Sequence, residues 1–377
     1  MAKKTKRSRT GKKRSQKRAA PLLKFLREWG AFLVIAVLII ALGVFLSTRS
    51  RQTSEITPAP PYDVYFTQGG LGAAAPDGLL ALILTDVASA TESVDLATPG
   101  LDLAPLADSL IAAKGRGVEV RVVQNPPGAE DTAVISVTAY LQEHGVPVTL
   151  HPHEDGLGAA FLVVDQRLAW AGSADFSRRG LEENAAFLLR WETAQMAQAF
   201  HGEFEEMFVE GSFGPTSPAN TSPNYVAVPN VSIVSIYMTP EDDPLGEVLR
   251  TINAVKGDII LLTEGLDDGR LANRLADEAS APSVLFRGIL GSAGLSGEAD
   301  TVLQQYEASL PAYAGAGRLQ ENVILIDSET VIIFSQPMHR QDFEQRDGFV
   351  LIVRDRSLGR VFRLEAQRLY EQVEGQP

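Results

Sequence analysis

Cysteine is absent from this chain of 377 residues, and histidine is scarce. Without cysteine there is no disulfide framework, no thiolate zinc site, no iron–sulfur cluster and no cysteine nucleophile. Any histidine chemistry must use one of five side chains, which are His144, His151, His153, His201 and His339. The apolar fraction of 45% is ordinary for a globular protein, so the chain is expected to fold.

Lysine nearly disappears after residue 51, where only Lys114 and Lys256 remain. Residues 1–28 hold twelve Lys and Arg against one acid, a net charge near +11. From residue 52 onward, 20 basic residues stand against 46 acidic ones, a net charge near −26. Proteins that bind nucleic acids contact phosphates with Lys and Arg, so we expect no nucleic-acid partner for the acidic body.

Charge is missing altogether between residues 29 and 48, a run of twenty mostly apolar residues. As a helix this run reaches about 30 Å, the thickness of a bilayer core. It is too long for a cleaved secretory signal and no small-residue cleavage site follows it. We therefore predict a single-pass signal anchor at 29–48, with the basic tail 1–28 in the cytoplasm and the body outside it. The tail is expected to contact anionic lipid, and nucleic-acid binding is the alternative for this segment.

Two polar, Pro-containing stretches divide the rest of the chain. Residues 49–62 and 213–230 are predicted linkers, and they leave two units of ordinary domain size at 63–212 and 231–377. In each unit, apolar strand patterns alternate with helical ones, which predicts an α/β fold with mixed, largely parallel sheets. The expected strands are 93–98, 118–123, 148–151, 161–165, 168–173, 185–191, 258–263, 283–290, 323–327, 330–335 and 348–354. The expected helices are 77–90, 103–115, 133–144, 194–208, 244–256, 270–279 and 358–373.

The two units are similar to each other. A Gly-Leu-Asp turn at 100–102 recurs at 265–267, so its numbering is offset by 165. An apolar hairpin at 161–173 recurs at 323–335, where both the Asp after the first strand and the Ser after the second are offset by 162. Agreement of offsets over several elements predicts an internal duplication.

Two tandem repeats that end in strand, Asp, turn, strand and Gly-Ser resemble the phospholipase D superfamily. Its members carry H-x-K-x4-D-x6-G-S-x-N once per repeat, and the resemblance covers nearly all of residues 63–373. It implies one site formed by both repeats, in which one His attacks phosphorus and the other protonates the leaving oxygen. Lys, Ser and Asn hold the phosphoryl oxygens, and Asp orients the imidazole.

Neither repeat of this chain carries the histidine or the lysine of that motif. In the first repeat, the His, Lys, Asp, Ser and Asn positions are occupied by Gly158, Ala160, Asp165, Ser173 and Asp175. In the second repeat, the His, Lys, Asp and Ser positions are occupied by Gln320, Asn322, Asp327 and Ser335. Gly and Ala cannot attack phosphorus, and Gln cannot transfer a proton as His does. We expect the retained Asp and Ser residues to reflect the fold more than the chemistry.

Nearby histidines are the candidates for a relocated catalytic group, and His153 and His339 are the two we single out. The pair His151 and His153 resembles a fragment of a metal site but lacks a third ligand, so a solvated strand end is the simpler expectation and no metal or other cofactor is expected. The leading hypothesis is a membrane-anchored, catalytically degenerate protein that acts as a binding or scaffold module for an unknown protein or lipid ligand. The alternative is a divergent phosphodiesterase or phosphatidyltransferase that uses a relocated His.

Overall fold

Seven strands of the first repeat form one mixed sheet in a computed structural model, which describes residues 61–68, 78–154, 156–219, 225–226 and 233–374. Their order is β1-β7-β6-β5-β2-β3-β4. The bounds are β1 Tyr62–Phe66, β2 Ser93–Thr98, β3 Glu119–Gln124, β4 Val148–Leu150, β5 Phe161–Val164, β6 Leu168–Gly172 and β7 Phe187–Trp191. The helices are α2 Leu79–Ser89, α3 Ala104–Gly115, α4 Thr132–Glu143 and α5 Ala194–Glu205, with short turns η1 Arg179–Glu183, η2 Glu206–Glu210 and η3 Gly214–Thr216.

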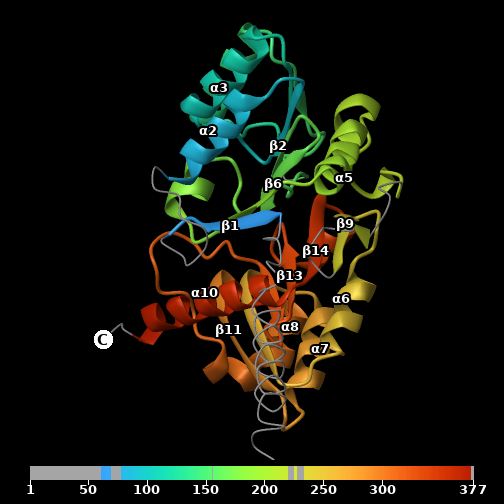
Figure 1. Cartoon of the computed structure of the whole chain (residues 1–377). Coiled ribbons are helices and arrows are strands. Elements are labelled where there is room, and N and C mark those ends of the chain that lie inside the picture. The colour runs from blue at the N-terminus through green and yellow to red at the C-terminus, as the bar shows by residue number, and fades with distance from the viewer. Residues whose placement is uncertain (1–60, 69–77, 155, 220–224, 227–232, 375–377) are drawn as a thin grey trace, which may run out of the picture. The chain divides into compact units, whose positions relative to one another are not determined.

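The second repeat forms another seven-stranded sheet of order β11-β10-β12-β13-β14-β9-β8 (Figure 1). Its strands are β8 Tyr225–Val226, β9 Ile233–Thr239, β10 Asp258–Leu266, β11 Leu285–Leu295, β12 Val323–Ile326, β13 Thr330–Phe334 and β14 Gly348–Arg354. Its helices are α6 Leu245–Ile252, α7 Gly269–Ala279, α8 Gly297–Leu303, α9 Arg340–Glu344 and α10 Arg356–Glu374, with η4 at Gln304–Ser309. The mixed α/β sheets and the internal repeat are therefore present as predicted.

The expectation of largely parallel sheets is wrong. In the first sheet only β2–β3 and β3–β4 are parallel, and in the second only β10–β11 is. Every other strand pair in the two described sheets is antiparallel. The physical reason is the hairpin in each repeat, since a turn of a few residues joins only antiparallel strands and places them in the middle of the sheet. Strands β1, β8 and β9 were not predicted, and β8 lies within the predicted linker 213–230.

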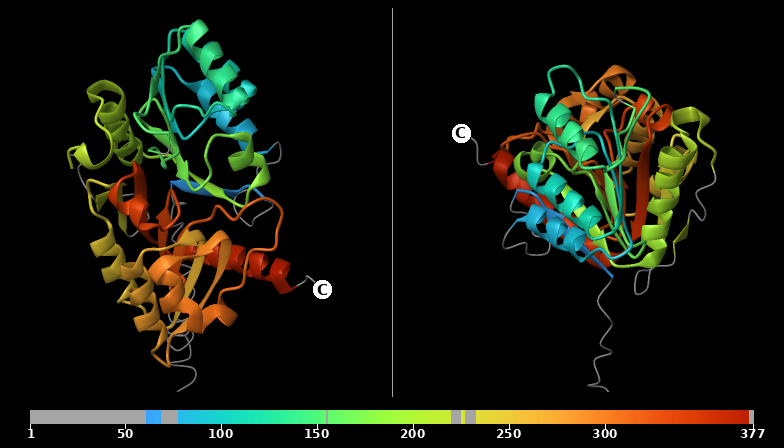
Figure 2. Two further views of the ribbon diagram at one scale, coloured as in Figure 1. Left: turned by 180° about the vertical axis from the view of Figure 1, so that it is seen from behind. Right: turned by 90° about the horizontal axis from the view of Figure 1, so that it is seen from above.

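Each sheet has one face covered by the helices of its own repeat and one face that shares a core with the other repeat. Helices α2 and α3 lie on one side of the first sheet and α5 on the other (Figures 1 and 2). The shared core contains residues of both sheets together with α5 and α10. Phe187 of β7 meets Phe362 of α10 at a ring-centroid distance of 4.8 Å, and Phe200 of α5 meets Phe349 of β14 at 5.2 Å. The two sheets thus fold against each other as one hydrophobic unit.

The predicted anchor at 29–48 lies outside the residues that the structure describes. Across the described ranges, no helix has both the length and the apolar character needed to cross a bilayer. The anchor, the tail and the limits of the two repeats as separate domains stay predictions.

Candidate functional site at the contact between the repeats

The two motif segments lie where the repeats hydrogen-bond to each other. Leu157 forms a parallel bridge with Asp347, and Leu319 forms the matching bridge with Ala185. The amide of Gly158 donates to the carbonyl of Asp347 at 2.8 Å. The amide of Gln320 donates to the carbonyl of Ala185 at 2.7 Å. The two contacts are equivalent, because Leu319 and Asp347 lie 162 residues after Leu157 and Ala185, the same offset as the two hairpins. The contact therefore has the pseudo-two-fold arrangement that the resemblance implies.

A side chain at the first His position would meet Gln336 of the second repeat. A Cβ atom on Gly158 would lie 1.7 Å from Oε1 of Gln336, a residue of the second repeat. Gln336 is buried, and its Nε2 donates to the carbonyl of Asp342 at 2.7 Å. The Oε1 atom has no hydrogen-bond partner among the described residues. Gln336 therefore occupies the space into which a histidine at position 158 would project.

The second His and Lys positions hold amides that are engaged in structural hydrogen bonds. Oε1 of Gln320 accepts from Nδ2 of Asn184 at 2.9 Å. Oδ1 of buried Asn322 accepts from the amide of Glu264 at 3.0 Å and from the hydroxyl of Thr263 at 3.2 Å. Ala160, at the Lys position of the first repeat, is 3% exposed within the core of that repeat. None of these groups supplies a nucleophile or a cation.

The two retained serines make the same pair of hydrogen bonds in the two repeats. Ser173 Oγ accepts the amide of Phe187 at 3.2 Å, and Ser335 Oγ accepts the amide of Phe349 at 2.9 Å. Both serines are buried, and their own amides donate back to the carbonyls of the same two phenylalanines. Each hydroxyl therefore extends the pairing of a hairpin with the next strand.

The two retained aspartates hold the hairpin turns against the start of a neighbouring strand. Asp165 and Asp327 have φ of 50° and 53°, a left-handed conformation that Asp tolerates better than most residues. The Asp165 carboxylate accepts the amides of residues 91–93, and the Asp327 carboxylate accepts those of residues 256–258. Burial alone would raise the pKa of Asp165, but the bonds from Glu92, Ser93 and Thr91 outweigh it and lower the pKa to about 2.

Asp175, at the Asn position of the first repeat, is half-buried and bound locally. Its Oδ1 accepts the amide of Ser177 at 3.0 Å and also the hydroxyl of Ser177. Burial raises the pKa of Asp175, while hydrogen bonds from Ser177 and Gln320 act in the opposite direction. The motif of the resembled family has Asn at this position, where this chain has a carboxyl.

Three of the histidines contact partners within their own repeat. His144 Nδ1 lies 2.8 Å from the carbonyl of Tyr140, and His201 Nδ1 lies 2.9 Å from Oδ2 of Asp95. His339 Nδ1 lies 3.1 Å from Oδ2 of Asp342, a contact that raises the pKa of His339 despite partial burial. His339 is also the residue before α9, and its Nε2 lies over Gly265 at the end of β10.

The expectation of a solvated strand end at His151 is wrong. The residue is 3% exposed, and its Nε2 lies 2.7 Å from Oδ2 of Asp347 in the other repeat. The amide of His153 donates to Nδ1 of His151 at 2.9 Å, and the same ring nitrogen lies 3.0 Å from the carbonyl of His153. His153 itself is exposed. Within the parts of the chain that the structure describes, no three His, Asp or Glu side chains are grouped as metal ligands.

Sequence reasoning missed a set of buried glutamates at the repeat contact. Glu203 of α5 and Glu365 of α10 occupy equivalent positions, at the same offset as the two hairpins, and both are almost fully buried. Burial raises the pKa of Glu203 well above its usual value, and the charges of Glu241, Glu206 and Asp347 add to the effect. Burial also raises the pKa of Glu241 to about 7. The recurrence of Glu at the offset of 162 is the sequence signal that could have identified Glu203 and Glu365.

Glu365 interacts with a carboxyl of the second motif segment, that of Glu321. Glu321, between the His and Lys positions, is fully buried, and burial followed by the charge of Glu365 raises its pKa. Arg368 Nε donates to both oxygens of Glu365, at 3.1 and 3.0 Å. One arginine thus neutralises the carboxylate of Glu365, while burial and the charge of Glu365 both raise the pKa of Glu321.

Residues 83–208 match the model of a family described as "Cardiolipin synthase, PLD-like domain". These residues are a phospholipase D-like domain. No curated protein matches the sequence.

Solved structures share the fold at low sequence identity. Phosphatidylserine synthase from Haemophilus influenzae Rd KW20 is 11% identical, with a TM-score of 0.58 over 87% of this chain and 90% of that one. Polyphosphate kinase from Porphyromonas gingivalis is 13% identical, with a TM-score of 0.57 over 81% of this chain. This chain spans only 47% of the length of the kinase. Nuc from Salmonella typhimurium, a phospholipase D family member, is 22% identical over 39% of this chain and 93% of its own, with a TM-score of 0.33.

Proposed function

We propose that this chain is a phospholipase D-like protein that has lost the histidine chemistry of its fold and acts as a binding module at the cell envelope. The observation that carries the proposal is the occupation of the first His position by Gln336. A nucleophile at residue 158 would need space that a side chain of the other repeat already fills. Gln320 at the second position has no titratable nitrogen, so neither half of the site can exchange a proton or form a phosphohistidine.

The same proposal places the module at the outer face of the cytoplasmic membrane. The uncharged run 29–48 supports a single-pass anchor, and the basic tail supports a cytoplasmic N-terminus next to anionic lipid. The ligand of the module is a protein or a lipid of the envelope, in keeping with the acidic body, which disfavours nucleic acid.

A turnover assay of the full-length chain in detergent micelles tests the loss of activity. The substrates are a short-chain phosphatidylcholine and single-stranded DNA, and release of choline or of nucleotides is measured. We expect no release above that of buffer. Release that is abolished in His153→Ala or in His339→Ala, but not in His144→Ala, would contradict the proposal and assign the chemistry to the altered histidine.

One observation favours the alternative, a divergent phosphodiesterase or phosphatidyltransferase. His339 follows Ser335 by four residues, pairs with Asp342 and is 20% exposed at its side chain. A His–carboxylate pair with one free ring nitrogen is the arrangement that general acid–base catalysis uses. This candidate predicts transfer activity that depends on both His339 and Asp342 and that rises as the imidazole loses its proton.

A further inference from the structure

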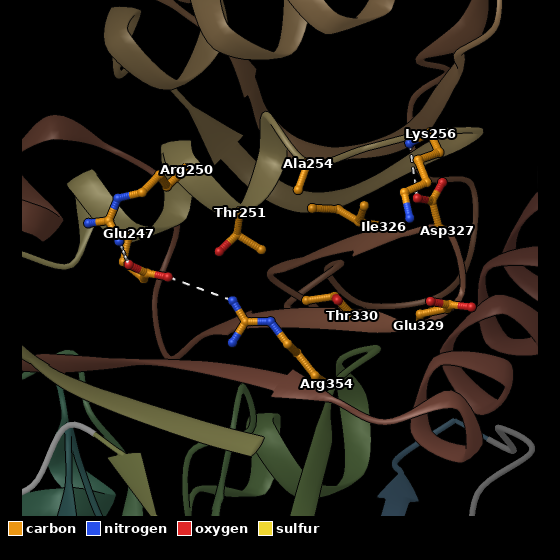
Figure 3. A pocket seen from close by; sticks show the side chains of 10 residues that line it. All are labelled: Glu247, Arg250, Thr251, Ala254, Lys256, Ile326, Asp327, Glu329, Thr330 and Arg354. Carbon is orange, nitrogen blue, oxygen red and sulfur yellow. Dashed lines mark hydrogen bonds and ion pairs between the residues drawn. The ribbon is translucent and has the colours of Figure 1, made fainter. Parts of the chain in front are cut away.

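A surface cavity of about 300 Å³ opens at the far end of β12 from Gln320 and Asn322. It is lined by Glu247, Arg250, Thr251, Ala254, Lys256, Ile326, Asp327, Glu329, Thr330 and Arg354. Arg354 and Lys256 approach the space from opposite sides, with Thr251, Ala254 and Ile326 between them (Figure 3). Its volume suits a small organic molecule. Apart from Asp327, the cavity contains none of the motif positions.

The carboxylates around this cavity are already engaged. Glu247 is shared by two arginines, Arg250 and Arg354. Asp327 accepts three backbone amides. Glu329 pairs with Arg356, which lies outside the lining, at 2.5 Å. Each carboxylate of the cavity therefore already has ion-pair or hydrogen-bond partners within the protein.

Two cations of the cavity, Arg354 and Lys256, have fewer partners within the protein. Arg354 lies 3.6 Å from Glu247, which is longer than a direct hydrogen bond and leaves donors of the guanidinium free. The ammonium of Lys256 has no carboxylate within ion-pair distance among the described residues. Lys256 is one of only two lysines in an acidic body, and it stands beside this cavity.

A buried hydroxyl without a partner completes the lining. Thr251 is 6% exposed, and its Oγ1 has no hydrogen-bond partner among the described residues. The equivalent residue of the first repeat, at the offset of the Gly-Leu-Asp turns, is Asp86, which accepts bonds from Trp170 at 2.8 Å and Arg190 at 2.7 Å. The second repeat has isoleucines in place of Trp170 and Arg190, at 332 and 352. The donor that Thr251 offers is left for something outside the protein, since an unmade buried hydrogen bond is unfavourable.

We infer that this cavity binds a small molecule that carries a phosphate group. A guanidinium, an ammonium and a hydroxyl are the donors that proteins use for phosphate oxygens, and among the described residues the ammonium of Lys256 has no carboxylate partner. The volume exceeds that of phosphate alone and has room for a short glycerol-like group. Apart from Asp327 the site contains none of the motif positions, and it does not depend on whether those positions are inactive.

Isothermal titration of the full-length chain in detergent micelles, at constant ionic strength, tests this inference. The probes are inorganic phosphate, sn-glycerol 3-phosphate, dihexanoyl phosphatidic acid and glycerol. We expect glycerol 3-phosphate to bind with a dissociation constant of about 1 mM or tighter and glycerol not to bind. Equal binding of inorganic phosphate identifies free phosphate as the source, and tighter binding of the phosphatidic acid identifies a lipid headgroup.

Three variants locate the binding. Lys256→Gln and Thr251→Val should each weaken it about tenfold, the loss of one charged or neutral hydrogen bond to a phosphate. Lys114→Gln, which alters the other lysine of the body, should leave it unchanged. Thr251→Val keeps the shape of the side chain and removes an unpartnered hydroxyl, so its melting temperature should not fall. The inference is overturned if glycerol 3-phosphate gives no heat at about 10 mM, or if Lys256→Gln and Thr251→Val bind it as the parent does.

Discussion

At the scale of one residue, Gly158 shows how the motif segment keeps its place in the fold without a histidine side chain. The amide of Gly158 donates to the carbonyl of Asp347 in the other repeat, and this contact needs no side chain. Its missing Cβ leaves the space that Gln336 fills from the other repeat. A glycine and a glutamine thus lie in close contact where the family motif has a histidine, and the two should behave as a coupled pair.

A double-mutant cycle tests that coupling. Gly158→Ala should destabilise the protein by about 1–3 kcal/mol because it overpacks against Gln336. Gln336→Ala should restore much of that stability when the two changes are combined, as measured by denaturant unfolding. Gly202→Ala on α5 is the control, since a Cβ there meets nothing within 4 Å and should stabilise the helix slightly. Additive effects at 158 and 336 would show that the two side chains do not share this space.

Glu203 carries a second residue-scale prediction, which concerns pH. Its pKa is raised in the folded protein, so the folded state keeps a proton that the unfolded chain releases above about pH 4.5. Stability should therefore fall as pH rises from about 4.5 through about 7, where Glu241 also titrates. Glu203→Gln should raise the melting temperature at pH 8 and have little effect at pH 5.

The matched control for that experiment is Glu210→Gln, a neighbouring exposed residue on the following turn. It should leave the melting temperature unchanged at both pH values. A Glu203→Gln variant that is destabilised equally at pH 5 and pH 8 would mean that the carboxylate form is the one the fold requires.

At the scale of elements, the hairpins β5–β6 and β12–β13 are the most constant parts of the repeat. Each turn is closed by an aspartate in a left-handed conformation, and that carboxylate also caps the amides at the start of β2 or β10. The Asp of the Gly-Leu-Asp turns does similar work, since Asp102 and Asp267 accept the amides of Arg178 and Arg340 at 2.7 Å. These repeated carboxylate-to-amide bonds give the acids at these positions a structural role.

Asp165→Asn tests this structural role. The amide side chain presents one acceptor and no charge to three backbone donors, so we expect a loss of about 2 kcal/mol in the free energy of unfolding near pH 7. Because the folded pKa is lowered, the contribution is complete above the unfolded value of 3.8 and disappears as pH falls through about 2. The difference from the parent should shrink toward pH 2, whereas exposed Asp63→Asn should be neutral throughout. A loss that is constant with pH would refute the ionic origin.

At the scale of the whole molecule, the sequence predicts the periodic elements and fails where distant residues meet. Both hairpins and both Gly-Leu-Asp turns follow from patterns of neighbouring residues. Strand β1 follows a Pro-rich stretch and could not be recognised without its partner β7, and the burial of His151 depends on Asp347, which is far away in the sequence. The unpartnered hydroxyl of Thr251 depends on residues far away in the sequence, because the second repeat has isoleucines where Trp170 and Arg190 bind Asp86 in the first.

The absence of cysteine makes the proposed membrane topology directly measurable. Ser15→Cys in the basic tail and Ser280→Cys at an exposed site after α7 each introduce a single thiol into the full-length chain. In intact cells a membrane-impermeant maleimide should label residue 280 and not residue 15, which should react only after permeabilisation. Protection of residue 280 in intact cells would place the body on the cytoplasmic side instead.

Formation of a covalent phosphoryl-enzyme is the most direct test of the central claim, that the motif positions no longer support histidine chemistry. The full-length chain in detergent micelles is incubated with a phosphatidyl donor labelled at phosphorus, quenched in base, and analysed for acid-labile label on the protein. The account predicts no labelling above that of a heat-denatured sample. Stoichiometric labelling that disappears in His339→Ala or in His153→Ala would contradict it.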